Sequence, residues 1–187
     1  MSQNHQSPLG IGKIGNAMYG SDYMVEVIRE LGIRYIALNP GASYRGLHDS
    51  IVNFPGDGPE MILCTHEEIA VALANGYFRA CGQPIATGLH NVVGLQHASM
   101  AIFNAWCDRS AILNLGGGGP IDANHRRSTD WVHTALVQGN AVRDYVKFDD
   151  QPNSVEATAE SLLRAMRTAM TDPKGPVYIC LDSDLQE

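Results

Sequence analysis

Several common site signatures are missing from this sequence, and each absence excludes a class of chemistry. The four cysteines, Cys64, Cys81, Cys107 and Cys180, include no Cys-x-x-Cys pair of the kind that zinc and redox sites use. No Gly-x-Ser-x-Gly turn offers a hydrolase nucleophile, and no His-x-x-x-His spacing offers helical metal ligands. Because each cysteine has apolar neighbours, we expect all four to be small buried hydrophobic residues in a reducing compartment.

Basic charge and long apolar runs are also scarce. The net charge is -7, and the one basic cluster, His125-Arg126-Arg127, is too short to follow a nucleic-acid backbone. No segment approaches the roughly 20 apolar residues that span a membrane, and residues 1–16 lack the features of a secretion signal. We therefore expect a cytoplasmic protein that binds neither nucleic acid nor membrane, with residues 1–19 as a flexible N-terminal leader.

Short apolar runs alternate with helical segments over residues 20–187, which we predict to be one domain. Ser21 or Asp22 can cap a first helix, and Gly32 can end it. The runs predict strands at 34–38, 61–64, 84–87, 111–115, 145–148 and 177–181, and helices at about 45–52, 66–80, 95–106, 131–141 and 155–171. This alternation predicts an α/β fold: a doubly wound, mainly parallel six-stranded sheet with helices on both faces.

Glu67, in the first turn of the helix predicted at 66–80, is the most informative residue. An acid is common there because free backbone amides attract negative charge. Thr65 and Glu68 fit a capping box, which explains Glu68 and leaves Glu67 without a capping role. The helix continues with three small residues, Ala70, Ala74 and Gly76. These residues let a second helix approach, so we predict that Glu67 lies in a packed seam and shares a proton with a ligand.

Two further loops follow predicted strands, at the sheet edge where doubly wound folds bind ligands. Asn39-Pro40-Gly41 is a turn whose glycine can let a ligand approach the backbone. His90 precedes a predicted helix that carries Gly94 and His97, and either histidine can serve as acid, base or hydrogen-bond donor near neutral pH. The run Gly116–Gly119 lacks the lysine of a phosphate loop, and we interpret it as a flexible crossover.

Taken in order, these motifs resemble the pyrimidine-binding domain of thiamine diphosphate-dependent enzymes. The segment from His66-Glu67-Glu68 to Gly82 is similar to the family signature His-Glu-x-x-Ala…Gly-Tyr-Ala-Arg-x-x-Gly. Asn39-Pro40-Gly41 and Leu89-His90, followed by Asn104-Ala105-Trp106, resemble the benzoylformate decarboxylase branch, near acetohydroxyacid synthase. The ending Gly175-Pro176-Val177-Tyr178-Ile179 is similar to the last strand of that domain, so the resemblance covers about residues 20–184.

The resemblance implies a role for each candidate residue. Glu67 matches the glutamate that shares a proton with the aminopyrimidine of thiamine diphosphate and activates the cofactor for attack on a 2-keto acid. His90 matches an active-site histidine that transfers protons. Pro40-Gly41 matches the loop beside the cofactor, Gly94 matches the glycine that admits the pyrimidine, and His97 stands where many relatives have asparagine. The implied enzyme is a decarboxylating lyase or an acetolactate synthase-like carboligase.

The resemblance also implies parts that this sequence does not supply. Family members hold the diphosphate through magnesium, with a second domain that carries Gly-Asp-Gly and Asn-Asn. Gly56-Asp57-Gly58 precedes a strand and has no Asn-Asn after it, so we interpret it as a turn and predict no metal ligands. The chain is expected to be either one domain of a longer enzyme or a subunit that pairs with a diphosphate-binding subunit, which binds the magnesium. Alone, it should be inactive.

Assembly is the last implication, because sites in this family form between two chains. We expect a dimer or larger homo-oligomer, with an apolar, small-residue surface on the helices at 66–80 and 95–106. A non-catalytic subunit with the same fold is the alternative, although it would have no reason to keep Glu67. A nucleotide-binding Rossmann domain lacks its glycine fingerprint here. Ala42 replaces a substrate-contacting serine of the decarboxylase branch, so benzoylformate itself is a poor candidate substrate.

Overall fold

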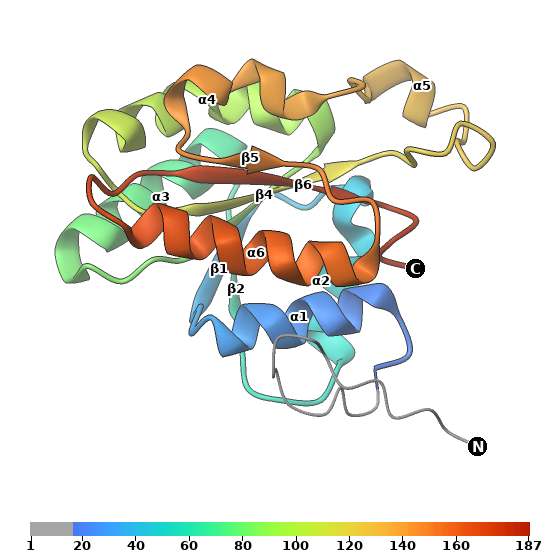
Figure 1. Ribbon diagram of the computed structural model, residues 1–187, viewed down its shortest axis with the longest axis horizontal. Coiled ribbons are helices and arrows are strands. Elements are labelled where there is room, and N and C mark those ends of the chain that lie inside the picture. The colour runs from blue at the N-terminus through green and yellow to red at the C-terminus, as the bar shows by residue number, and fades with distance from the viewer. Residues whose placement is uncertain (1–16) are drawn as a thin grey trace.

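The computed structural model describes residues 17–187, which build helices around one parallel sheet (Figure 1). Six strands lie in the order β2-β1-β3-β4-β6-β5, and every neighbouring pair is parallel. The strands are β1 (Tyr35–Leu38), β2 (Glu60–Leu63), β3 (Ala86–Leu89), β4 (Leu113–Gly118), β5 (Asp149–Asp150) and β6 (Val177–Asp182). The predicted doubly wound α/β fold is confirmed. The predicted leader, residues 1–19, falls largely outside the described residues.

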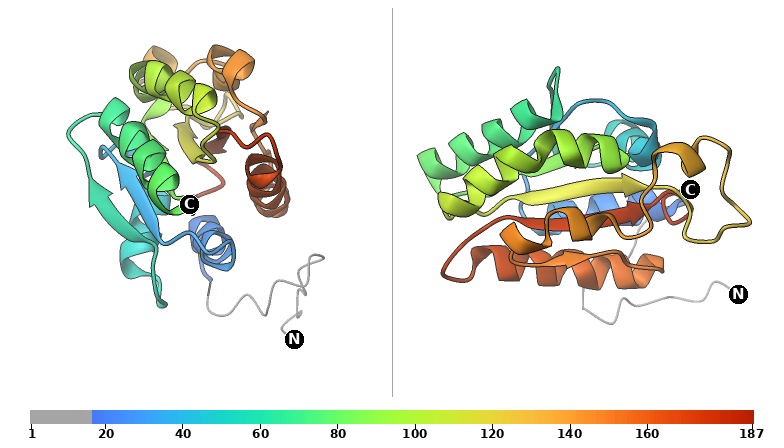
Figure 2. Two further views of the ribbon diagram at one scale, coloured as in Figure 1. Left: turned by 90° about the vertical axis from the view of Figure 1, so that its left-hand side faces the viewer. Right: turned by 90° about the horizontal axis from the view of Figure 1, so that it is seen from above.

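Helices cover both faces of the sheet, as the view from above in Figure 2 shows. The helices α1 (Gly20–Glu30) and α6 (Val155–Met170) share a core with one face, and α2 (Arg45–Asn53) packs against α1. On the other face, α3 (Glu67–Cys81) and α4 (Asn91–Cys107) pack side by side. Within residues 17–187, no helix is both long and apolar enough to cross a bilayer.

The strand β6 shows why both faces are dry. Val177, Ile179 and Leu181 pack with α1 and α6, whereas Tyr178 and Cys180 point to the core of α3 and α4. Successive side chains of a strand point to opposite faces, so a strand covered on both sides needs an unbroken apolar run. The sequence of β6 has such a run, and it was recognisable as a buried strand.

The predicted helix boundaries agree with the structure to within one residue for α2, α3 and α6. Gly32 adopts a left-handed φ of 71° directly after α1, and the Asp22 carboxylate accepts hydrogen bonds from the amides of Met18 and Tyr19. The predicted stop at Gly32 is confirmed. The helix begins earlier than the predicted cap, because Tyr19 is the N-cap, and Asp22 caps it from the third helical position. The helix α4 begins four residues earlier than predicted, because the amide of Gly94 already donates to the carbonyl of His90 at 2.6 Å.

The segment between β4 and β6 was predicted wrongly. The expected helix at 131–141 is a single short helix, α5 (Asp130–His133), followed by a 3₁₀ turn, η2 (Gln138–Ala141). Gln138 explains the break, because its side-chain amide donates to the carbonyl of Gly117 at 2.9 Å and so draws the chain onto the sheet. The strand expected at 145–148 is also wrong: a second 3₁₀ turn, η3 (Arg143–Tyr145), takes up Tyr145, and the two-residue strand β5 begins only at Asp149, after the predicted strand ends.

Two smaller interpretations also need correction. The glycine run is not a flexible crossover, because Gly116, Gly117 and Gly118 continue β4 and are buried. A Cβ on Gly116 would overlap the Tyr178 ring, and one on Gly117 would overlap Ser43, so the glycines make room for packed neighbours. The cysteines divide into two classes: Cys64 and Cys180 are buried as predicted, but Cys81 and Cys107 are exposed near the ends of α3 and α4. Gly56 and Gly58 lie in the bent segment between α2 and β2, both with positive φ.

Candidate functional site

The three loops that the sequence analysis selected meet at the carboxyl edge of the sheet. The parallel strands β1, β2 and β3 are neighbours, so the segments that follow them emerge side by side. A Cβ on Gly41 would lie 2.5 Å from the Cβ of His90, which shows how closely the first and third loops pack. A Cβ on Gly94 would lie 2.9 Å from Oε1 of Glu67, which brings the second loop to α4.

Glu67 is the first residue of α3, and only 4% of it is exposed. The predicted capping box is wrong: His66 is the N-cap, and its Nδ1 accepts the amide of Glu68 at 3.2 Å. The helix then buries Ala70 and Ala74 against the sheet and α4, whereas Gly76 is exposed and takes no part in this seam. The carboxyl of Glu67 therefore lies between two helices, where Gly94 leaves space for it.

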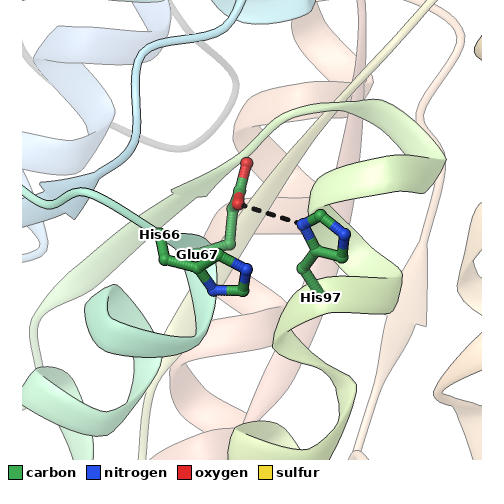
Figure 3. Close-up of side chains that lie close together, drawn as sticks. All are labelled: His66, Glu67 and His97. Carbon is green, nitrogen blue, oxygen red and sulfur yellow. Dashed lines mark ion pairs between the residues drawn. The ribbon is translucent and has the colours of Figure 1, made fainter.

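His97 faces the Glu67 carboxyl from the second turn of α4 (Figure 3). Its Nδ1 lies 3.7 Å from Oε2 of Glu67, and its side chain is 52% exposed. The ring of His66 stacks on the ring of His97, with centroids 4.7 Å apart and planes inclined by 18°. The three side chains connect a buried acid to solvent.

The possible metal-ligand atoms of these three residues lie within 4.8 Å of one another, a spacing that could hold a metal ion. Three features oppose it. Lone pairs lie in the imidazole plane, so two stacked rings do not point them at one ion. The lone pair of His66 Nδ1 already accepts the amide of Glu68. The N-terminus of a helix also disfavours a cation. We assign no metal to this cluster.

His90 is the N-cap residue of α4 and has two polar neighbours. Its Nδ1 lies 3.0 Å from Oγ of Ser43, and its ring meets the ring of His133 edge to face, with centroids 5.3 Å apart. Burial lowers the pKa of His90, the nearby His133 lowers it further, and the negative charge of Glu67 acts in the opposite direction. A neutral imidazole at this place can accept a proton.

The structure adds three polar residues that the sequence analysis missed. Ser43 orients His90, and His133 comes from α5, held by the amide of Asn91 at 2.9 Å from its Nδ1. Tyr44 donates its hydroxyl to the carbonyl of Asn39, and burial together with the charge of Glu67 raises its pKa, so it stays protonated. Ser43 and Tyr44 directly follow the Asn39-Pro40-Gly41 turn, and that position was a usable signal. His133 had no comparable signal in the sequence, because it lies far along the chain from the residues that it contacts.

The remaining predicted residues lie at the same edge. Gly41 packs against His90 itself, so its missing side chain makes room for a histidine. Pro40 and Ala42 are exposed beside it. Gly94 is buried on α4 against Glu67. All the residues predicted for the site therefore gather at one edge of the sheet, and the roles predicted for them stay predictions.

Comparison with known proteins places this geometry in a family. Residues 18–140 match the thiamine pyrophosphate enzyme family, N-terminal TPP binding domain. The chain is 28% identical over 162 residues to a benzoylformate decarboxylase of Pseudomonas aeruginosa, covering 85% of this chain and 29% of that protein. It is 26% identical over 165 residues to the acetolactate synthase large subunit of Haemophilus influenzae, covering 88% of this chain and 28% of that one.

Solved structures agree at the level of the fold. The benzoylformate decarboxylase of Polynucleobacter necessarius superposes with a TM-score of 0.79 at 23% identity, covering 91% of this chain and 31% of that one. The 4-hydroxybenzoylformate decarboxylase of Rhodococcus jostii RHA1 gives a TM-score of 0.77 at 23% identity, covering 89% and 30%. This chain thus spans less than a third of the length of these relatives. It belongs to the thiamine pyrophosphate enzyme family, and it corresponds to the N-terminal, pyrimidine-binding domain of such enzymes.

Proposed function

We propose that residues 20–187 are the pyrimidine-binding half of a thiamine diphosphate-dependent 2-keto-acid decarboxylase or carboligating synthase, in which Glu67 activates the cofactor. When bound, the cofactor supplies a carbon nucleophile that adds to the keto group and accepts the electrons of the broken C–C bond. The chain supplies the groups that orient the pyrimidine and move its protons.

The position of Glu67 carries this proposal. Its carboxyl is 5% exposed, so water competes little for its hydrogen bonds, and it lies at a helix N-terminus whose amides attract anions. Gly94 offers no side chain to cover it. A ring nitrogen that meets this carboxyl can take or return one proton, which is the step that general acid–base catalysis needs here.

The surrounding residues have supporting roles. His90, held by Ser43, is the candidate for proton transfer to or from the substrate, and its lowered pKa keeps it neutral and able to accept a proton near pH 7. Pro40 and Gly41 form the edge of the loop beside the pyrimidine. His97 lies over the open side of Glu67, within reach of a ring bound there.

A second domain must complete the site. The diphosphate and its magnesium ion would be held by another domain or a partner subunit, so we expect the chain alone to bind the cofactor weakly and to be inactive. Its placement in the cytoplasm remains a prediction, consistent with the four unpaired cysteines.

Exposed apolar residues on α3 and α4 support pairing with a second chain. Ile69 on α3 is 48% exposed, and Val93, Met100 and Phe103 on α4 are 43%, 57% and 43% exposed. We call these four residues the α3–α4 surface. An apolar surface of this kind is typical of a protein interface, and pairing through it would give the expected dimer or larger homo-oligomer.

The names of the relatives bear on substrate and on the alternative. Benzoylformate decarboxylases and acetolactate synthases are among them, which supports a small 2-keto acid as substrate. A non-catalytic subunit is the competing proposal. Isothermal titration of thiamine diphosphate into the completed assembly separates the two, because a non-catalytic subunit that has lost the site gives no heat.

Replacement of the acid is the direct test of the proposed role. In the completed enzyme, Glu67→Gln keeps the size of the side chain but cannot donate or accept the proton, so turnover should fall about 100-fold or more. The neighbouring Glu68 is exposed and serves as matched control: Glu68→Gln should stay within about twofold of wild type. Near wild-type turnover of Glu67→Gln would remove the proposal.

A further inference from the structure

We infer that His97 is a positioning residue that exchanges protons between buried Glu67 and solvent, an inference that rests on the proposed role of Glu67. A carboxyl at 5% exposure that must gain and lose a proton needs a route to water. His97 is half exposed and holds Nδ1 3.7 Å from the carboxyl, so its ring reaches both environments.

A stacking contact with His66 supports the ring of His97. The His66 ring stacks on it with planes inclined by only 18°, and His66 is itself held by the amide of Glu68. That amide donates to the lone pair of His66 Nδ1, so this nitrogen is not available to the Glu67 carboxyl. Nδ1 of His66 is therefore committed to the amide of Glu68, and the His66 ring acts as a platform for His97, the ring whose nitrogen faces the carboxyl.

The proton transfer requires no reactant other than an acid in the solvent. A solvent acid protonates Nε2 of neutral His97, the Nδ1–H bond breaks, and an O–H bond forms on Oε2 of Glu67. The ring is left neutral in its other tautomer. Since 3.7 Å exceeds the roughly 3.2 Å limit of a good hydrogen bond, a small side-chain rotation or a bridging water completes the contact.

Other titratable groups face Glu67 and must be separated from His97. His66 lies on the same helix end, His90 precedes α4, and Tyr44 approaches from the η1 turn (Ala42–Tyr44) after β1. Tyr44 has a raised pKa and does not titrate near neutrality. Among the described residues, only His97 has a ring nitrogen, Nδ1, that pairs with the Glu67 carboxyl; His66 and His90 form no such pair.

Carbon-13 NMR of the full chain, without cofactor, tests the inference. The side-chain carboxyl carbon of Glu67, assigned by its loss in Glu67→Gln, and the histidine ring carbons are followed together from pH 4.5 to 8.5. We expect a step in the Glu67 signal at the midpoint of the His97 ring. The step should be lost in His97→Asn and in His97→Gln, the latter retaining length and polarity without a titrating ring.

The control is His125→Asn, since His125 pairs with Asp184 at 2.6 Å and its loss should leave the step unchanged. A Glu67 curve that is the same in wild type and in both His97 variants would overturn the inference, as would a His97 titration to which Glu67 does not respond. Because no cofactor is present, this outcome is independent of Glu67→Gln turnover, and either claim can fail while the other stands.

Discussion

Gly94→Ala offers the sharpest structural prediction, because it changes one methyl group at the point where α4 meets Glu67. The added Cβ would lie 2.9 Å from Oε1, 3.1 Å from Cγ and 3.2 Å from Cδ of Glu67. All three distances are shorter than the 3.4 Å at which ordinary contact begins. The carboxyl must therefore either strain or leave its place.

The two effects on stability oppose each other. Alanine gains about 1 kcal/mol over glycine in a helix interior, and overpacking of a buried site costs about 1–3 kcal/mol. If the carboxyl stays in place, the free energy of unfolding should fall by between zero and about 2 kcal/mol. If it swings away, stability rises, but the site loses its acid. In either case, turnover of the completed enzyme should fall, by about tenfold or more.

Gly76→Ala is the matched control, because a Cβ on Gly76 meets nothing within 4 Å. It should stabilise the isolated chain by about 1 kcal/mol through helix propensity alone. Urea unfolding of the isolated chain measures both variants, and steady-state turnover is measured in the completed enzyme. The reasoning is refuted if Gly94→Ala stabilises as much as Gly76→Ala and leaves turnover unchanged, since the carboxyl would then not lie against α4.

Three further predictions follow from the contacts above. The pKa of His90 is lower in the folded chain than in the unfolded chain, so its contribution to stability is present above the unfolded-state pKa and is lost as pH falls through the folded-state pKa. Urea unfolding from pH 7.5 to 5 should therefore show a free energy of unfolding that falls with pH, and His90→Asn should reduce this dependence. Alkylation of the native protein at pH 8, measured by mass spectrometry, should label Cys81 and Cys107 but not Cys64 and Cys180. The latter two are buried, and burial raises the pKa of Cys180 to about 11. Rapid labelling of Cys180 would contradict this packing. Met100→Lys should weaken self-association about tenfold or more in sedimentation equilibrium, because it places a charge on the α3–α4 surface, while Val52→Lys on α2 should have no such effect.

Much of the fold was predictable because its signals are local. The apolar runs and their spacing identified five of the six strands closely, and caps such as Gly32 and Asp22 marked the first helix. Two of the errors fall where distant residues decide. The helix expected at 131–141 breaks because Gln138 bonds to Gly117 on a strand far away in sequence. The glycine run continues β4 because bulky neighbours such as Tyr178 occupy the space above it.

The candidate site shows the same division. Glu67, His90, Gly94 and the turn at Pro40-Gly41 were selected from sequence, and the structure brings them to one edge. The sequence could not show which of these residues contact one another: His90 packs against Gly41, and Glu67 packs against Gly94. His133 joins the site through a tertiary contact with Asn91 that no local pattern announces.

Proton exchange at the reactive carbon of thiamine diphosphate tests the central claim most directly. Hydrogen–deuterium exchange at that carbon, quenched at set times and read by proton NMR, is compared in the completed wild-type enzyme, Glu67→Gln and Glu68→Gln. Loss of the acid should slow exchange about 100-fold or more, with Glu68→Gln unchanged. Equal exchange rates in all three would contradict the account, because the cofactor would then be activated without the buried carboxyl.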